Sequence, residues 1–174
     1  VTANGDIWSF ATAGNPNTGA PVRSDMTLYA RWQSDEFKID YDLDNGTNDI
    51  NNPTSYVYGV GVTSFADPVR DNYQFLGWFD APSGGNLITS ISDTDDGDKI
   101  LYANWKANDF VINYSLDGGS NHATNPTTYT YGIGVTSFGD ASKAGYKFLG
   151  WYDAESGGNA VTNITDTATG TQTL

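Results

Sequence analysis

The sequence repeats itself at a fixed interval. Residues 73–86, YQFLGWFDAPSGGN, return as YKFLGWYDAESGGN at residues 146–159. The same shift of 73 residues aligns residues 37–101 with residues 110–174 without a gap, and 36 of the 65 aligned positions are identical. Self-similarity of this kind is the signature of a tandem array. We therefore expect copies of one small folding unit rather than one large domain.

The repeat predicts three segments. Residues 1–35 form the C-terminal part of a preceding repeat, because LYARW at 28–32 matches LYANW at 101–105. Residues 36–108 form repeat one, and residues 109–174 form repeat two, which lacks its closing strand. An unpaired sheet position invites pairing with another chain. We therefore expect neighbouring repeats as partners, and head-to-tail exchange in which residues 28–32 of one molecule complete repeat two of the next.

Alternation of residue type predicts short strands. The first strand has Phe37, Ile39 and Tyr41 on one face and charged residues on the other, which is typical of a half-buried strand. Further strands are expected around residues 56–60, 73–80 and 100–105. Asp67 and Pro68 resemble a cap and a first helical position and predict a short helical turn. The expected fold class is α+β, mostly β, without a choice between a β-grasp and a small sandwich.

Composition excludes several partners. The net charge is −13, and such a chain is repelled by nucleic acid and by anionic membrane surfaces. No apolar run approaches the roughly 18 residues of a membrane helix, so no membrane insertion is expected in this segment. The chain has no cysteine, so disulfides and thiolate metal sites are unavailable. His122 is the only histidine and has no counterpart in repeat one, so no repeated catalytic triad is expected and the chain is predicted not to be an enzyme.

Two tryptophans are candidate ligand-binding residues. Trp78 and Trp151 are followed two positions later by Asp80 and Asp153. Aromatic faces beside carboxylates suit carbohydrate, so these four residues form a candidate sugar platform. Packing of both tryptophans in the core is the competing interpretation. The glycine before each tryptophan predicts a bulge or a close approach of another backbone.

Acidic clusters in repeat one are candidate metal ligands. Asp42 and Asp44 follow the first strand, and Asp93 and Asp95 belong to a second cluster. Oxygen-rich loops of this kind bind calcium, although the register of an EF-hand and its closing Glu are missing. Calcium is thus the candidate metal, the competing interpretation is a solvated acidic face, and no other cofactor is expected.

Several motifs together resemble a known family. An opening FxIxY strand, YxYGxxVTSF, GYxFLGWYD and LYAxW are similar to the Listeria–Bacteroides repeat, the internalin B-repeat family. Asn72 departs from the pattern, since Gly145 stands at the matching position of repeat two. The resemblance implies tandem, β-grasp-like repeats with no catalytic residues. The short links at residues 33–36 and 106–109 predict a semi-rigid, elongated array. It also implies a bacterial cell-surface, extracellular or cell-wall setting.

The function implied is structural. On this resemblance the chain is expected to be a stalk or spacer that also contributes to adhesion. The alternative is an adhesin module that binds a glycan or a host protein, and the ligand on the host or the cell surface is unknown.

Overall fold

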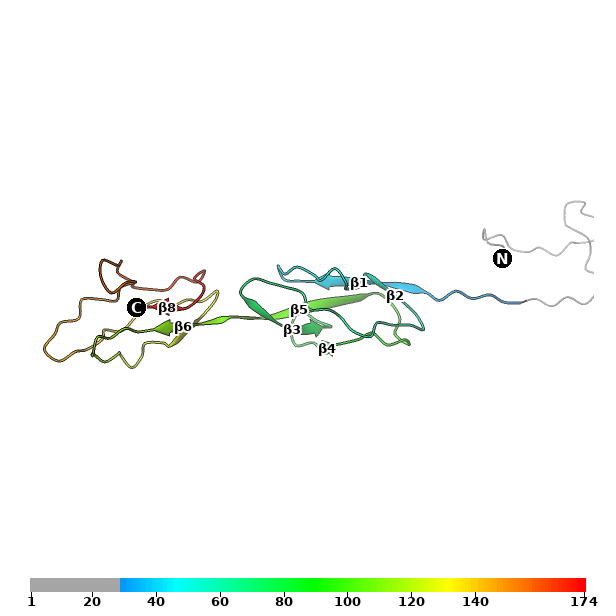
Figure 1. The fold of residues 1–174 in the computed structure, drawn as a ribbon. Helices are drawn as coiled ribbons and strands as arrows, with labels where there is room; N and C mark the ends of the chain where they lie inside the picture. The colour runs from blue at the N-terminus through cyan, green and yellow to red at the C-terminus, as the bar shows by residue number, and fades with distance from the viewer. Residues whose placement is uncertain (1–28) are drawn as a thin grey trace, which may run out of the picture. The chain divides into compact units, whose positions relative to one another are not determined.

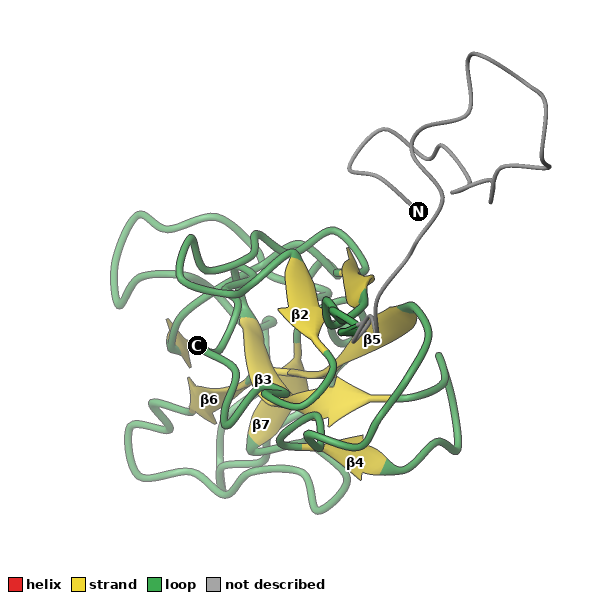
Figure 2. Cartoon of the chain, turned by 90° about the vertical axis from the view of Figure 1, so that its right-hand side faces the viewer, coloured by secondary structure: helices red, strands yellow, loops and turns green. Residues whose placement is uncertain are grey.

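The computed structural model describes residues 29–174, of which residues 34–174 form one compact unit. Residues 1–28 of the expected fragment at 1–35 lie outside the described residues. The described part is mostly β, with two mixed sheets and no helix (Figures 1 and 2). The strands of repeat one are β1 (Glu36–Asp42), β2 (Ser55–Val57), β3 (Tyr73–Phe79), β4 (Leu87–Ile88) and β5 (Lys99–Ala107). Those of repeat two are β6 (Asp109–Asn113), β7 (Thr128–Thr130) and β8 (Gln172–Thr173).

The sheet of repeat one has the order β2-β1-β5-β3-β4. The first and last strands of the repeat, β1 and β5, lie side by side and run parallel, while the other pairs are antiparallel. The alternation predicted for β1 is confirmed, because Ile39 is buried while Lys38 and Asp40 are exposed. The ladder between β3 and β5 shifts register between Phe75 and Gly77, which confirms the predicted bulge.

The core of each repeat is a cluster of aromatic and aliphatic side chains. In repeat one the buried members are Ile39, Tyr56, Trp78, Ile91, Leu101 and Ala103. Tyr41 stacks edge-on against Trp78, with ring centroids 5.0 Å apart, and its hydroxyl donates to the carbonyl of Pro53 at 2.8 Å. Burial raises the pKa of Tyr41 to about 12. The hydroxyl therefore stays protonated and keeps its role as a donor.

Repeat two reproduces the same scheme with a smaller sheet. Its order is β7-β6-β8, and its buried members are Ile112, Tyr129, Trp151, Ile164 and Leu174. Residues 146–151, which match β3, form no strand, although Tyr152 still bridges to Ala160. In repeat one β3 pairs mainly with the second half of β5. No described residue of repeat two matches this half of β5.

The expected helical turn at Asp67 and Pro68 is wrong. Val69 instead forms an antiparallel bridge with Thr47, and each donates its N–H to the other's carbonyl at 2.8–2.9 Å. Ser120 and Ser142 form the matching bridge in repeat two. A bridge that uses both backbone groups of Val69 is incompatible with a helical turn through that residue.

Candidate functional site

The two candidate tryptophans lie inside the molecule. Trp78 is 3 % exposed and Trp151 is 7 % exposed. The indole N–H of Trp78 donates to the carbonyl of Ala66 at 3.2 Å, and that of Trp151 donates to the carbonyl of Gly139 at 3.0 Å. A sugar ring stacks on an open aromatic face. Neither indole presents one in this structure, so both side chains serve packing here.

The aspartates after the tryptophans hold turns. Asp80 accepts the backbone N–H of Asn86 at 2.7 Å and its side-chain amide at 2.9 Å, and Asp153 makes the same pair of bonds to Asn159. The hydrogen bond from the Asn side chain is the main reason why the pKa of each carboxyl lies below its usual value. Both carboxylates therefore close the Ser-Gly-Gly-Asn turns, and the structure does not join them to an aromatic platform.

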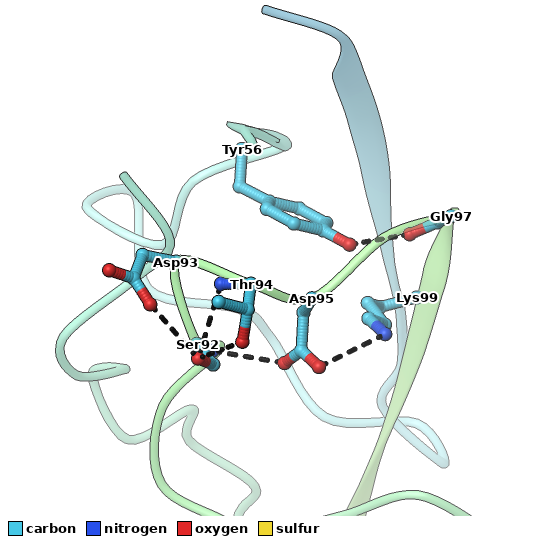
Figure 3. Close-up of polar contacts among 7 residues, drawn as sticks. All are labelled: Tyr56, Ser92, Asp93, Thr94, Asp95, Gly97 and Lys99. Carbon is cyan, nitrogen blue, oxygen red and sulfur yellow. Dashed lines mark hydrogen bonds and ion pairs between the residues drawn. The ribbon is translucent and has the colours of Figure 1, made fainter. Parts of the chain in front are cut away.

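Asp93 and Asp95 lie in the turn before β5 (Figure 3). One carboxylate oxygen of Asp95 accepts the N–H of Ser92 at 2.9 Å, and the other lies 4.0 Å from the ammonium of Lys99. The Asp93 carboxylate accepts the hydroxyl of Ser92 at 3.2 Å. The two side chains thus bond to their own turn.

The other acidic pair is engaged as well. Asp42 accepts the N–H of Asp44 at 3.2 Å, and Asp44 forms an ion pair with Arg70 at 2.6 Å. Within residues 29–174, no group of three or more His, Cys, Asp or Glu side chains is placed to hold a metal ion.

A buried asparagine organises each repeat and was not among the residues predicted from the sequence. The side chain of Asn52 donates to Asn48 and to the carbonyl of Ala66, and accepts the N–H of Ala66 at 2.7 Å. Asn125 makes the same three contacts in repeat two. The signal was present, since an Asn-Pro pair occupies the same position of both repeats in an otherwise variable loop.

One residue joins the two repeats. Asn108, between β5 and β6, donates its N–H to the carbonyl of Asn72 in repeat one and accepts the N–H of Tyr131 in repeat two, both at 2.9 Å. Asn72 has a positive φ of 64°, and Gly145 at the matching position has a positive φ of 79°. Asparagine tolerates this region better than most residues. The backbone of the joint is thus fixed on both sides by hydrogen bonds.

Two tyrosines pack across the joint. Tyr73 of repeat one meets Tyr131 of repeat two edge-on, with ring centroids 5.7 Å apart. The guanidinium of Arg70 lies 3.9 Å from the centre of the Tyr73 ring. Aromatic pairs of this geometry contribute about 0.5–1.5 kcal/mol beyond the area they bury.

The two tyrosine positions of the joint recur elsewhere in the repeats, at Tyr58 and Tyr146. Tyr58 matches Tyr131 and is 47 % exposed, and Tyr146 matches Tyr73 and is 72 % exposed. Lys143 lies 4.6 Å from the Tyr146 ring, as Arg70 lies over Tyr73. Each repeat therefore carries both tyrosine positions, and within residues 29–174 one pair, Tyr73 and Tyr131, is in contact.

These features define a class of protein: a tandem array of one mostly-β unit, with a bonded joint between its copies. The chain belongs to the Listeria-Bacteroides repeat family, whose model matches residues 37–104 and 110–174. This family is one of surface proteins such as the internalins, and it is generally non-enzymatic.

Three relatives are similar over part of their length. A putative membrane protein of Evansella cellulosilytica is 26 % identical over 84 % of this chain and 21 % of its own. A putative Gly-rich membrane protein of the same organism is 28 % identical over 97 % of this chain and 18 % of its own. Internalin H of Listeria monocytogenes is 33 % identical over 52 % of this chain and 16 % of its own. The chain thus spans about a fifth or less of each relative.

No solved structure matches the chain. Among the residues that the structure describes, no helix has the length and apolar character needed to cross a membrane.

Proposed function

We propose that this chain is a non-catalytic spacer in a bacterial cell-surface protein, anchored at the cell wall. The observation that carries the proposal is the joint at Asn108. A spacer must keep its copies at a defined angle, and a single linking residue with both backbone groups bonded leaves little freedom. The Tyr73–Tyr131 contact supports the same role, because it ties side chains of both repeats together. On this proposal the array is semi-rigid and elongated.

The strand order supports a β-grasp-like unit. The order β2-β1-β5-β3-β4, with β1 parallel to β5 in the middle, is that of a β-grasp sheet with one short strand added. In the described repeats an irregular crossover takes the place of the helix between β2 and β3. We infer a reduced β-grasp, in which the Thr47–Val69 bridge and the aromatic core do the packing that a helix does elsewhere.

The angle between repeats tests the spacer proposal. Because the chain has no cysteine, spin labels can be placed at Ile50→Cys, which is 97 % exposed, and at the matching exposed position Ala123→Cys. We expect a narrow distribution of label distances that broadens in Tyr131→Ala. Tyr58→Ala removes the matching tyrosine outside the joint and should leave the distribution unchanged. A broad distribution in the unmodified chain would overturn the proposal.

A binding module is the alternative. On this proposal, sheet edges or exposed side chains of the β3 position recognise a glycan or a host protein. Leu76 and Leu149 favour it, because they match in the two repeats and are 52 % and 80 % exposed. Binding to glycan arrays or matrix proteins that falls in Leu76→Ser would support this alternative. If binding is unchanged in Leu76→Ser, or if the unmodified chain binds none of these ligands, the spacer remains the proposed function.

A further inference from the structure

The sheet of repeat one has two faces, and the core packs on one of them. Trp78, Leu101 and Ala103 are buried on the core face. Because side chains alternate along a strand, their neighbours in β3 and β5 point to the opposite face, which we call the outer face. Two aromatic residues of the outer face, Phe79 and Tyr102, are partly exposed and belong to no core cluster of the described residues. Apolar side chains that gather outside a core mark an interaction surface.

The strand register places the two rings in one row across four strands. Phe79 of β3 pairs with Leu87 of β4 on one side and with Tyr102 of β5 on the other. Tyr102 pairs in turn with Asp42 of β1. Neighbouring strands lie about 4.8 Å apart, so this outer row is about 14 Å long. It has an apolar end at Leu87 and an acidic end at Asp42.

The apolar end of the outer row is closely packed. Leu87 is 55 % exposed, and its side chain lies over the backbone of Gly77. A Cβ at Gly77 would overlap a methyl carbon of Leu87 and lie 3.4 Å from the Phe79 ring. The glycine therefore lets both side chains form one apolar surface. Ala160 stands in the place of Leu87 in repeat two, so this surface is particular to repeat one.

The acidic end of the outer row has two exposed carboxylates. Asp40 and Asp42 both lie on the outer face of β1. Asp40 pairs with Ile100, which is 50 % exposed. The fold does not require these acids, because Asn113 and Ser115 stand at the matching positions of repeat two and β6 still pairs with β7 and β8.

The charge around the outer row favours a cationic partner. Repeat one, residues 36–108, contains 12 Asp and Glu but 4 Lys and Arg. The lysines of the outer face lie toward its ends. Lys38 comes two residues before Asp40, and Lys106 comes four residues after Tyr102 and pairs with Asp109 at 3.5 Å. An acidic field of this kind attracts cations and repels anions.

We propose that the outer row binds a basic peptide segment of another protein, one that carries an arginine and an apolar side chain. A guanidinium can stack on an aromatic ring and pair with a carboxylate, and Tyr102 beside Asp42 offers both. The apolar side chain packs on Leu87 and Phe79. An extended chain rises about 3.4 Å per residue, so a row of about 14 Å sets the two partner residues about four positions apart. This even spacing keeps both on one side of the peptide.

Nuclear magnetic resonance of the nitrogen-15-labelled chain tests the proposal with two peptides that are acetylated and amidated at their ends. The first is Gly-Phe-Ser-Gly-Ser-Arg-Gly, and the second has Gln in place of Arg. We expect the first to shift the backbone amide signals of residues 40–42, 79, 87 and 100–102, more weakly at high salt. The second should bind about two- to fivefold more weakly, since it lacks the cation.

Matched variants separate the outer row from general charge attraction. Tyr102→Thr keeps a strand-favouring residue and should weaken binding about two- to fivefold. Asp40→Asn combined with Asp42→Asn should weaken it by about as much. Asp67→Asn combined with Asp71→Asn removes the same charge from exposed positions between β2 and β3. This control should keep the affinity within about twofold of the unmodified chain.

Three outcomes would overturn the proposal. The first is that the arginine peptide shifts no signal of the outer row. The second is an equal loss of affinity in the two double variants, which would show attraction by the net charge alone. The third is that cellohexaose shifts the signals of the outer row and the peptide does not, because the row would then be a glycan platform. The inference goes beyond the spacer proposal and does not rest on it, since the spacer test reads label distances within one chain.

Discussion

Asn52 and Asn125 stabilise the crossover of each repeat from within. Each is almost fully buried, and its amide satisfies both backbone groups of a residue in the middle of the crossover, Ala66 or Gly139. The same carbonyl also accepts the tryptophan N–H. One side chain therefore fixes the loop and, through it, the central indole of the core.

Replacing this asparagine should destabilise the repeat that carries it. Asn52→Ala leaves the partly buried N–H of Ala66 without its acceptor, and an unsatisfied backbone group costs about 1–3 kcal/mol when it is buried. We expect the free energy of unfolding of repeat one to fall by about that amount in urea titrations. Asn51→Ala is the matched control, since Asn51 is exposed and bonds only to its neighbour Asp49, and it should change stability by less than about 0.5 kcal/mol. Equal losses in the two variants would contradict the role assigned to Asn52.

At the scale of elements, two loops come into contact at Gly61, the residue before the antiparallel β-bridge between Val62 and Ile91. Gly61 has a φ of 68°, and a Cβ there would overlap the carbonyl oxygen of Ile91 and lie 2.8 Å from the carbonyl carbon of Ser92. Gly134 repeats this approach against Ile164. Gly59 has a φ of 87° but no atom within 4 Å of its Cβ position.

The pair of glycines separates backbone strain from crowding. Gly59→Ala should lower the free energy of unfolding by about 1–2 kcal/mol, the cost of a left-handed conformation for a residue with a Cβ. Gly61→Ala carries that cost and must also push two backbones apart, which adds about 1–3 kcal/mol. Urea unfolding of both variants checks this order. Similar losses would mean that the loops separate without resistance.

The strands and the irregular segments differ in how well sequence predicts them. Phe37, Ile39 and Tyr41 show a period of two that the buried face retains in both repeats, so β1 could be predicted. The helical turn rested on Asp67 and Pro68 alone, and a helix this short has too few hydrogen bonds to offset its nucleation. Thr47, more than 20 residues away in the chain, decides the conformation of Val69 instead. Local sequence carries no sign of that partner.

For the candidate site, too, local patterns could be predicted from the sequence, whereas contacts between distant residues could not. Trp78 and Asp80 were found because they match in both repeats, but conservation between repeats reflects packing and turn closure as readily as binding. The joint was harder to predict. Asn108 matches Asp35, and Tyr131 matches Tyr58, so the sequence shows two tyrosines and no sign of which one has a neighbour.

For the molecule as a whole, acid should be destabilising despite the net charge of −13. The pKa values of Asp80, Asp109, Asp117 and Asp153 lie below their ordinary value of 3.8 in the folded chain, chiefly because side chains of Asn86, Thr130, Lys143 and Asn159 donate to them. A depressed pKa contributes stability that is present above the ordinary value and is lost as the pH falls through the lower folded value. Protonation also removes mutual repulsion among the remaining carboxylates, which acts in the opposite direction.

The melting temperature should therefore fall as the pH drops below 3.8. In the double variant Asp80→Asn, Asp153→Asn, the two turns have no carboxylate left to titrate, so the fall should be shallower. Thermal scans of both proteins across this range make the comparison. An identical fall in both would show that the turns closed by Asp80 and Asp153 do not contribute to it.

The parallel pairing of β1 and β5 determines how a repeat responds to tension. The chain enters repeat one at the start of β1 and leaves it at the end of β5, and these strands are direct neighbours that run in the same direction. A pull on the two ends slides one strand lengthwise against the other, so the bonds between them are loaded in shear and must break together. Antiparallel neighbours pulled from adjacent ends would instead lose their hydrogen bonds one after another. In the proposed spacer role this arrangement is favourable, because repeat one resists a pull until the whole ladder between β1 and β5 fails.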